Sequence, residues 1–231
     1  MWGDRFDGRG VIRAGDAAKV RASEESQTMN RAILLYSGGI DSTYLLYELL
    51  AKTVGSGSRQ RKNPVDEVAC LSFNYGQPHV DKELGAAKRI TGRLGVEHLF
   101  EKLDFPFLRQ DMVGGDPVVP NRNMIFISVA GAIAKFRGNN MVFIGCTQSD
   151  YGVFPDCRPA FLRTADETLM CAVGVRLLAP LVSRKKSDLV KAGVEQYGID
   201  WGETWSCYAG GDEPCGECLA CRERDACEFC D

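Results

Sequence analysis

The residues at 37–43, Ser-Gly-Gly-Ile-Asp-Ser-Thr, combine two glycines with three hydroxyl side chains and one carboxylate. They follow the apolar run 32–36, and helical spacing begins at about Thr43. Glycine lets a backbone approach an anion closely, and the free N–H groups at the start of a helix favour phosphate. The loop matches neither the mononucleotide pattern G-x-x-x-x-G-K-[ST] nor the dinucleotide pattern G-x-G-x-x-G. It therefore predicts a phosphate site of another kind, with the candidate ligands Ser37, Gly38, Gly39, Asp41, Ser42 and Thr43.

Near the C-terminus, four cysteines have the spacing of metal ligands. The pattern C-x7-C-x2-C-x2-C is formed by Cys207, Cys215, Cys218 and Cys221. Four thiolates suit one tetrahedral Zn²⁺ in a closed structural site. The sequence has ten cysteines and no apolar signal segment at its start, so metal is favoured over disulfides. An iron–sulfur cluster is the alternative, and the further pair Cys227 and Cys230 leaves the ligand set open.

Polar and aromatic residues also follow other apolar runs. The stretch 73–79 reads Phe-Asn-Tyr-Gly-Gln-Pro-His, and the stretch 149–159 reads Ser-Asp-Tyr-Gly-Val-Phe-Pro-Asp-Cys-Arg-Pro. The Arg122 guanidinium before a long apolar helix suits a carboxylate or a phosphate, because its planar fork donates two hydrogen bonds at once. His79 is either a nucleotide-site residue or a helix N-terminal cap. Cysteines at 70, 146, 157 and 171 are interpreted as packed, unreactive thiols.

The elements that position these residues alternate between strand and helix. Apolar runs predict strands at 32–36, 67–73, 96–103, 141–144 and 175–178. Helical spacing predicts helices at about 43–52, 80–94, 123–136, 158–171 and 186–197. Repeated β-α units indicate an α/β fold, a parallel five-stranded sheet with helices on both faces. In such sheets the ligand site lies at the carboxyl ends of the strands, where the residues above are found.

Composition and charge restrict the class of protein. The chain has 231 residues, of which 45% are hydrophobic and 26% charged, with a net charge of −3. We expect residues 1–30 to form a partly disordered extension, residues 31–203 the α/β domain and residues 204–231 a small zinc-binding tail. The negative charge argues against direct nucleic-acid binding, and no apolar run reaches the roughly 20 residues that span a membrane. A cytoplasmic protein is therefore expected.

Several motifs, read in order, resemble one enzyme family. The loop at 37–42 is similar to the SGGxDS "PP-loop" of the ATP pyrophosphatases, the adenine nucleotide alpha hydrolase-like group. Four further motifs resemble the 7-cyano-7-deazaguanine synthases within that group: F-x-Y-G-Q-x-H at 73–79, P-x-R-N at 120–123, D-Y-x-x-F-P-D-C-R-P at 150–159 and P-L-x-x-x-x-K at 180–186. The cysteine segment resembles theirs too, and the likeness spans roughly 31–222. Pro78, Ser149 and Lys185 depart from the family pattern.

The resemblance implies a role for each group of residues. It implies ATP binding by the loop together with Phe73, Tyr75, Gln77 and His79. It implies catalysis by Asp41, Ser42, Arg122 and Lys186, with Mg²⁺ near Asp41. The substrate-binding residues would be Arg122, Asn123, Asp150, Tyr151, Phe154, Asp156 and Arg158. It also favours Cys207, Cys215, Cys218 and Cys221 as the Zn²⁺ ligands, and a homodimer.

The implied reaction converts 7-carboxy-7-deazaguanine and free ammonia to 7-cyano-7-deazaguanine, with two ATP cleaved to AMP and pyrophosphate. Three alternatives are open at this point. An enzyme of the same family can stop at the amide, and a PP-loop tRNA sulfurtransferase would carry an iron–sulfur cluster. A non-enzymatic zinc module would leave the loop and the 150–159 stretch without a purpose. Whether the product serves tRNA or DNA modification is not determined by the sequence.

Overall fold

The computed structural model describes residues 29–54, 65–105, 108 and 119–227. The predicted N-terminal extension, apart from its last two residues, lies outside this part of the chain. Most of the basic loop at 54–63 and Cys230 also lie outside it. The statements below concern the described residues.

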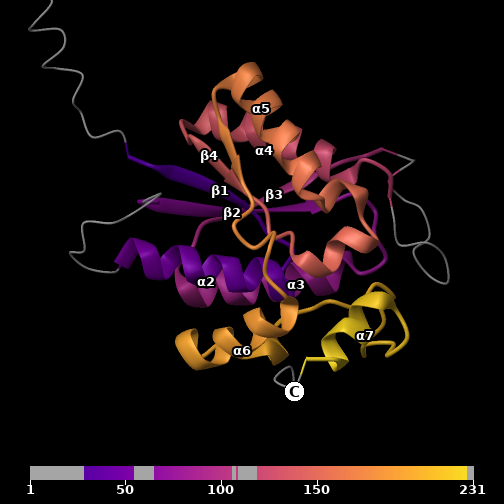
Figure 1. Ribbon diagram of the computed structural model, residues 1–231. Coiled ribbons are helices and arrows are strands. Elements are labelled where there is room, and N and C mark those ends of the chain that lie inside the picture. The colour runs from indigo at the N-terminus through magenta and orange to yellow at the C-terminus, as the bar shows by residue number, and fades with distance from the viewer. Residues whose placement is uncertain (1–28, 55–64, 106–107, 109–118, 228–231) are drawn as a thin grey trace, which may run out of the picture.

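A parallel five-stranded sheet forms the centre of the fold, as predicted (Figure 1). Its strands are ordered β3-β2-β1-β4-β5, with bounds β1 Arg31–Leu35, β2 Glu67–Asn74, β3 His98–Lys102, β4 Met141–Phe143 and β5 Arg176–Leu178. In the central register, Ile33 pairs with Ala69 on one side and Val142 on the other. Both faces of the inner strands β1, β2 and β4 are buried, which explains why these strands read as continuous apolar runs.

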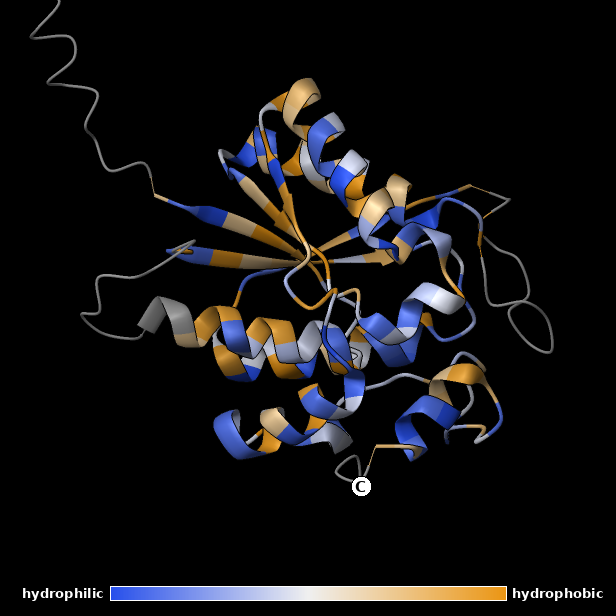
Figure 2. Ribbon diagram, in the orientation of Figure 1, coloured by the Kyte–Doolittle hydropathy of each residue, from blue (hydrophilic) through white to orange (hydrophobic). Residues whose placement is uncertain are grey.

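Helices cover both faces of the sheet, which confirms the predicted architecture. Helices α2 (Ile40–Val54) and α3 (Val80–Leu94) lie on one face, and α4 (Arg122–Arg137) and α5 (Pro159–Val173) lie on the other (Figure 1). Helix α6 (Lys186–Tyr197) packs against α2. The apolar side chains therefore form two cores, one on each side of the sheet. Figure 2 shows these hydrophobic residues concentrated on the strands and on the helix faces toward them.

The observed bounds differ from the predicted ones where loops join helices. Helix α2 begins at Ile40 rather than at Thr43, because the phosphate loop is already helical in its second half and the Thr43 amide bonds the Gly39 carbonyl at 3.0 Å. Strand β4 ends at Phe143, one residue earlier than expected. Cys171 is exposed, so its assignment to the core was wrong, whereas Cys70, Cys146 and Cys157 are buried as expected. Two residues from the buried Leu169, Cys171 faces away on helix α5.

The strand order places a switch point between β1 and β4. The chain leaves β1 toward α2 on one face, and it leaves β4 toward α5 on the other, so a crevice opens at the carboxyl ends of these strands. The cysteine-rich segment, with α7 (Leu219–Asp225), lies at the N-terminal end of α3, near the carboxyl ends of the strands (Figure 1). None of the described helices is long and apolar enough to cross a membrane.

Candidate active site

A cavity of about 260 Å³ lies at the switch point. The phosphate loop forms its floor, the residues after β2 and β4 form its sides, and the start of α4 closes one end. The cysteine-rich segment supplies a further wall through Trp205, Ser206, Tyr208, Ala220, Glu223 and Arg224. The site expected at the carboxyl ends of the parallel strands is therefore present, and segments from Leu35 to Arg224 contribute to it.

The phosphate loop presents Ser37, Gly39, Asp41 and Ser42 to the cavity. Gly38 has a φ of 78°, and a Cβ there would lie 2.9 Å from both the Ala87 nitrogen and the Glu83 oxygen, so the loop packs directly on α3. Thr43 does not line the cavity. Its hydroxyl instead bonds the Tyr36 hydroxyl at 3.1 Å in the core. Of the six predicted loop ligands, Gly38 and Thr43 thus support the loop from behind.

Lys186 lies between two carboxylates on the cavity wall. Its Nζ is 3.2 Å from Asp41 Oδ2 and 2.6 Å from Glu223 Oε2. Burial alone would lower the pKa of Lys186, but the two carboxylates outweigh it and raise the pKa. Burial raises the pKa of Asp41 to about 6, and Lys186 offsets only part of this effect. Asp41 Oδ1 is buried and has no hydrogen-bond partner among the described residues, so it can accept a cation or a hydrogen-bond donor.

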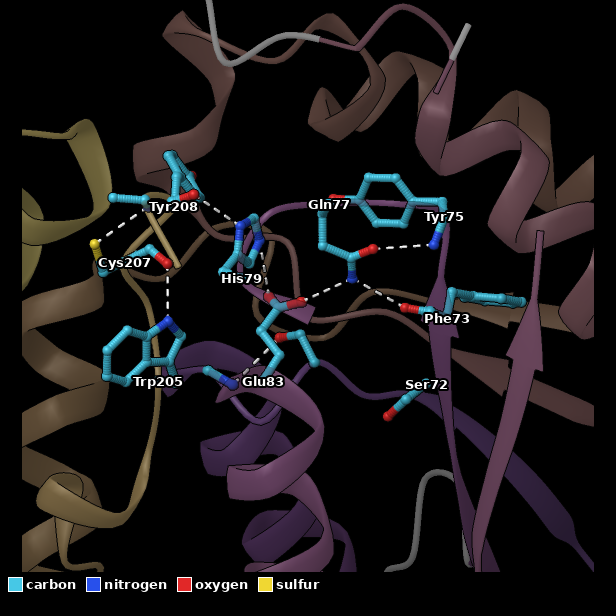
Figure 3. Close-up of polar contacts among 12 residues, drawn as sticks. Ser72, Phe73, Tyr75, Gln77, His79, Glu83, Trp205, Cys207 and Tyr208 are labelled. Atoms are coloured by element: carbon cyan, nitrogen blue, oxygen red, sulfur yellow. Dashed lines mark hydrogen bonds and ion pairs between the residues drawn. The ribbon is translucent and has the colours of Figure 1, made fainter. Parts of the chain in front are cut away.

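The end of strand β2 and the start of α3 form a hydrogen-bonded network (Figure 3). The Gln77 amide donates to the Phe73 carbonyl at 3.0 Å and to Glu83 Oε2 at 3.1 Å, and it accepts from the Tyr75 amide at 2.9 Å. His79 occupies the N-cap position of α3, yet its side chain makes no capping bond. Its ring contacts Glu83 Oε1 at 3.5 Å and the Tyr208 carbonyl at 3.0 Å. His79 therefore ties the cavity to the cysteine segment.

The start of α4 carries a positively charged side chain, Arg122, at the end of the cavity opposite the phosphate loop. Arg122 donates to the Tyr75 hydroxyl at 3.2 Å and lies against the rings of Tyr75 and Phe126. Asp156 accepts from the Asn123 amide at 2.9 Å, which holds the first turn of the helix. Asn121, the residue just before α4, has a φ of 61°, a conformation that asparagine tolerates better than most residues. Arg122 is thereby directed into the cavity.

The predicted substrate residues divide into two groups. Arg122, Asn123, Asp150 and Phe154 line the cavity, whereas Tyr151, Asp156 and Arg158 do not. The 3-10 turns η2 (Gln148–Gly152) and η3 (Pro155–Cys157) account for the difference, because they direct successive side chains to different sides. Asp156 supports α4, and Arg158 is exposed and donates to the Tyr151 carbonyl at 3.1 Å.

The four predicted metal ligands lie together in one cluster. Among the described residues, this is the one group of three or more cysteines close enough to share a metal ion. Their sulfur atoms lie within 4.8 Å of one another, with Cys215 and Cys221 4.0 Å apart. Thiolates around one Zn²⁺ at about 2.3 Å would be about 3.8 Å apart, so the cluster fits a single ion. Backbone N–H groups of Cys218 and Glu217 lower the pKa of the Cys215 thiol to about 6. Cys227 instead contacts the Glu223 carbonyl at 3.2 Å.

Sequence reasoning missed the residues that reach the cavity from distant segments, namely Glu83, Trp205, Tyr208 and Glu223. Trp205 and Tyr208 flank the metal-ligand candidate Cys207 in the sequence, and only the cysteine of this stretch carries a recognisable spacing. Glu223 is part of an Arg-Glu-Arg run that is typical of a solvated helix face. No local pattern indicates that this carboxylate meets Lys186, because 37 residues separate the two in sequence.

A solved structure shares the fold of this chain. The U34-tRNA thiolase NcsA from Methanococcus maripaludis, solved with its [4Fe-4S] cluster, is similar at a TM-score of 0.51 and 16% identity. The match covers 76% of this chain and 61% of that chain, and at this identity it supports the fold alone.

Sequence relatives match over most of their length. A protein from Porphyromonas gingivalis is 36% identical over 84% of this chain and 90% of its own length, and one from Chromohalobacter salexigens is 34% identical over 91% and 86%. Both are named 7-cyano-7-deazaguanine synthase. The family model described as queuosine biosynthesis protein QueC matches residues 31–115 and 110–228. This chain therefore belongs to the QueC family.

Proposed function

We propose that this protein is an ATP-dependent enzyme that converts 7-carboxy-7-deazaguanine and ammonia to 7-cyano-7-deazaguanine. One observation carries the proposal: a phosphate loop and the partly buried Arg122 face the same cavity, in a chain whose relatives are named 7-cyano-7-deazaguanine synthase. ATP and the carboxylated base would then lie end to end, with the reacting carboxylate beside the α-phosphate. Such positioning is the main contribution that an enzyme makes to phosphoryl and nucleotidyl transfer.

The phosphate end of the cavity supports binding of ATP. Ser37, Gly39 and Ser42 offer amide and hydroxyl donors at the start of α2, where the helix dipole favours an anion. The Lys186 ammonium lies beside them and remains protonated at physiological pH, because its two carboxylate neighbours raise its pKa. We assign to it the neutralisation of charge that grows on pyrophosphate as AMP is transferred. Phe73, Tyr75, Gln77 and His79 are proposed to border the nucleotide.

The opposite end of the cavity supports binding of the base. The Arg122 guanidinium can donate two parallel hydrogen bonds to a carboxylate, and Phe126 and Phe154 offer apolar surface for a planar ring. Asp150 faces the same space and is proposed to accept from the amino edge of the deazapurine. Asp156 is proposed to act through Asn123 and α4, while direct substrate contacts by Tyr151 and Arg158 stay predictions of the sequence.

The chemistry requires activation of a poor electrophile. The carboxylate attacks the α-phosphorus of ATP, and pyrophosphate leaves as an acyl adenylate forms. Ammonia then displaces AMP and gives the amide. A second adenylation on the amide oxygen allows loss of AMP with formation of the nitrile, so two ATP are used for each product. The protein's part is to hold the two reactants in line and to stabilise phosphate charge.

Two metal ions are part of the proposal. Mg²⁺ would be held near Asp41, whose buried and unpartnered Oδ1 suits a hard cation, and it would neutralise phosphate charge. Zn²⁺ would be held by the cysteine cluster. The close spacing of the four sulfur atoms favours one ion over an iron–sulfur cluster, in which iron and sulfide would separate the thiolates. The thiolase alternative therefore has no support from this cluster.

Mass spectrometry of the base product tests the proposal. The purified protein is incubated with 7-carboxy-7-deazaguanine, ATP, Mg²⁺ and ammonium, and AMP is measured in parallel. We expect the nitrile with two AMP for each product. The amide with one AMP would indicate the shorter reaction of the same family, and unchanged base without AMP would contradict the proposal. Replacement of Asp41 by Asn serves as the site-specific negative control.

Three further expectations belong to the same proposal. We expect a homodimer, which size-exclusion chromatography with light scattering measures directly. We also expect a cytoplasmic enzyme without a membrane or nucleic-acid partner, since a small base and ammonia are its substrates.

A further inference from the structure

Glu223 connects the cysteine segment to the cavity. It lies in α7, whose N-cap is Cys218 and whose first turn contains Cys221, two of the four clustered thiols. Its carboxylate accepts from Lys186 at 2.6 Å, closer than the 3.2 Å contact between Lys186 and Asp41. Side-chain exposure is 14% for Lys186 and 25% for Glu223, so water competes little for this contact.

Helix α7 is itself fixed by contacts on both sides of Glu223. The next residue, Arg224, donates to the Trp201 carbonyl at 2.6 Å and to the Thr204 hydroxyl at 2.9 Å. Trp201 is buried in the core formed by α2 and α6. On the other side, Cys221 belongs to the thiol cluster. The position of the Glu223 carboxylate is therefore set by the thiol cluster and by the core together.

From these contacts we infer that Glu223 is a positioning residue for Lys186, through which the metal-binding segment sets the geometry of the phosphate site. The inference rests on the proposed function, because Lys186 is assigned to the leaving pyrophosphate. A lysine side chain has four rotatable methylene groups, and ordering it is costly. Two carboxylates from different elements, at 3.2 and 2.6 Å, restrict the position of Nζ before ATP arrives. Without the Glu223 carboxylate, Asp41 alone would leave the Lys186 side chain free to turn toward α7.

The test replaces Glu223 by Gln, which keeps the shape and removes the charge. The matched control is Asp225→Asn, the same charge change on the exposed face of the same helix. We expect kcat for AMP formation to fall about tenfold in E223Q. KM for the deazaguanine should stay within twofold, and the control should match the wild-type protein. Metal content and the melting temperature are measured for each variant, so that loss of fold is recognised separately.

A double-mutant cycle with Lys186→Met shows whether Glu223 acts through the lysine. If it does, adding E223Q to K186M causes no further loss. Two results would overturn the inference. The first is a wild-type kcat in E223Q, even if the variant binds ATP more tightly. The second is a fall in kcat of about tenfold when E223Q is added to K186M, equal to its effect in the wild-type background. If E223Q loses its metal, Glu223→Asp is used in the same cycle, since it keeps the charge. A wild-type protein that forms no AMP would instead contradict the proposed function.

Discussion

Gly38 is the residue on which the geometry of the phosphate loop most depends. It has a left-handed φ of 78°, and its α-carbon lies against the backbone of α3 at Glu83 and Ala87. The Trp205 amide also donates to its carbonyl at 3.1 Å. One glycine thus joins the loop, the following βα unit and the cysteine segment, and any side chain there would push them apart.

Replacing Gly38 by Ala should destabilise the protein by about 2–4 kcal/mol, because a strained φ adds to an overlap with backbone atoms that cannot move aside. Chemical denaturation measures the change. The control is Gly92→Ala, in helix α3, where a Cβ meets no atom within 4 Å. That control should raise stability by about 0.5–1 kcal/mol. Equal stability of G38A and the wild-type protein would show that the loop does not pack on α3 in this way.

Arg122 allows a test of the base-binding end at the same scale. Arg122→Lys keeps the charge but loses the planar fork, so we expect KM for 7-carboxy-7-deazaguanine to rise about tenfold, with a smaller change in KM for ATP. Steady-state kinetics with each substrate varied in turn measures both constants. Arg163→Lys, on the exposed side of α5, is the control and should not alter either constant. A change confined to ATP would place Arg122 at the phosphate end.

At the scale of elements, α5 and β5 are held together by one carboxylate. Asp166 accepts from Arg176 Nη2 at 2.8 Å, from Arg176 Nε at 2.9 Å and from the Leu177 amide at 2.8 Å. Burial by itself would raise the pKa of Asp166, but Arg176 and the Leu177 amide together lower it. The ionised carboxylate therefore stabilises the edge strand of the sheet.

The sign of this pKa shift gives a pH-dependent prediction. A carboxyl whose pKa is lower in the folded protein contributes stability above its unfolded pKa, and this is lost as pH falls through the folded pKa. Asp166→Asn should thus cost about 1 kcal/mol at pH 7, a value reduced for the half-exposed Arg176. The difference should begin to shrink as pH falls below about 4, the ordinary pKa of an aspartate, and should disappear once pH is below the lowered folded pKa. Urea denaturation across this range measures it, with the exposed Glu167→Gln as control. A cost that persists at low pH would contradict the assignment.

Elements were more predictable from the sequence than the site they build. The β-α alternation predicted the parallel five-stranded sheet and the positions of α3 and α6, because this signal is local, but it did not predict the strand order. The phosphate loop and the thiol cluster were found in the same way. What periodicity does not contain is the direction of side chains in the turns η2 and η3, and hence the failure of Tyr151 and Arg158 to line the cavity. The contact between Lys186 and Glu223 joins residues 37 apart in sequence, so it is seen only once the tertiary structure is known.

At the scale of the whole molecule, the cysteine segment and the sheet form one site. His79, at the start of α3, contacts the Tyr208 carbonyl at 3.0 Å, next to the clustered Cys207 (Figure 3). The Trp205 indole donates to the Cys207 carbonyl at 2.8 Å. Trp205 and Tyr208 both line the cavity. A short segment with few helices has little core of its own, so a metal ion bound by the four cysteines would supply much of its folding free energy.

Removing one ligand should therefore affect stability and ATP binding together. In Cys221→Ser we expect metal content to fall, unfolding to be easier by at least about 3 kcal/mol, and the melting temperature to drop by roughly 10 °C. Binding of ATP should weaken in parallel, because Tyr208 and Glu223 lose their support. Elemental analysis, calorimetry and titration with ATP measure the three effects. Cys171→Ser, exposed on α5, should change none of them. If C221S lost its metal yet bound ATP as the wild-type protein does, the segment would be a separate structural unit, and the cavity would be complete without it.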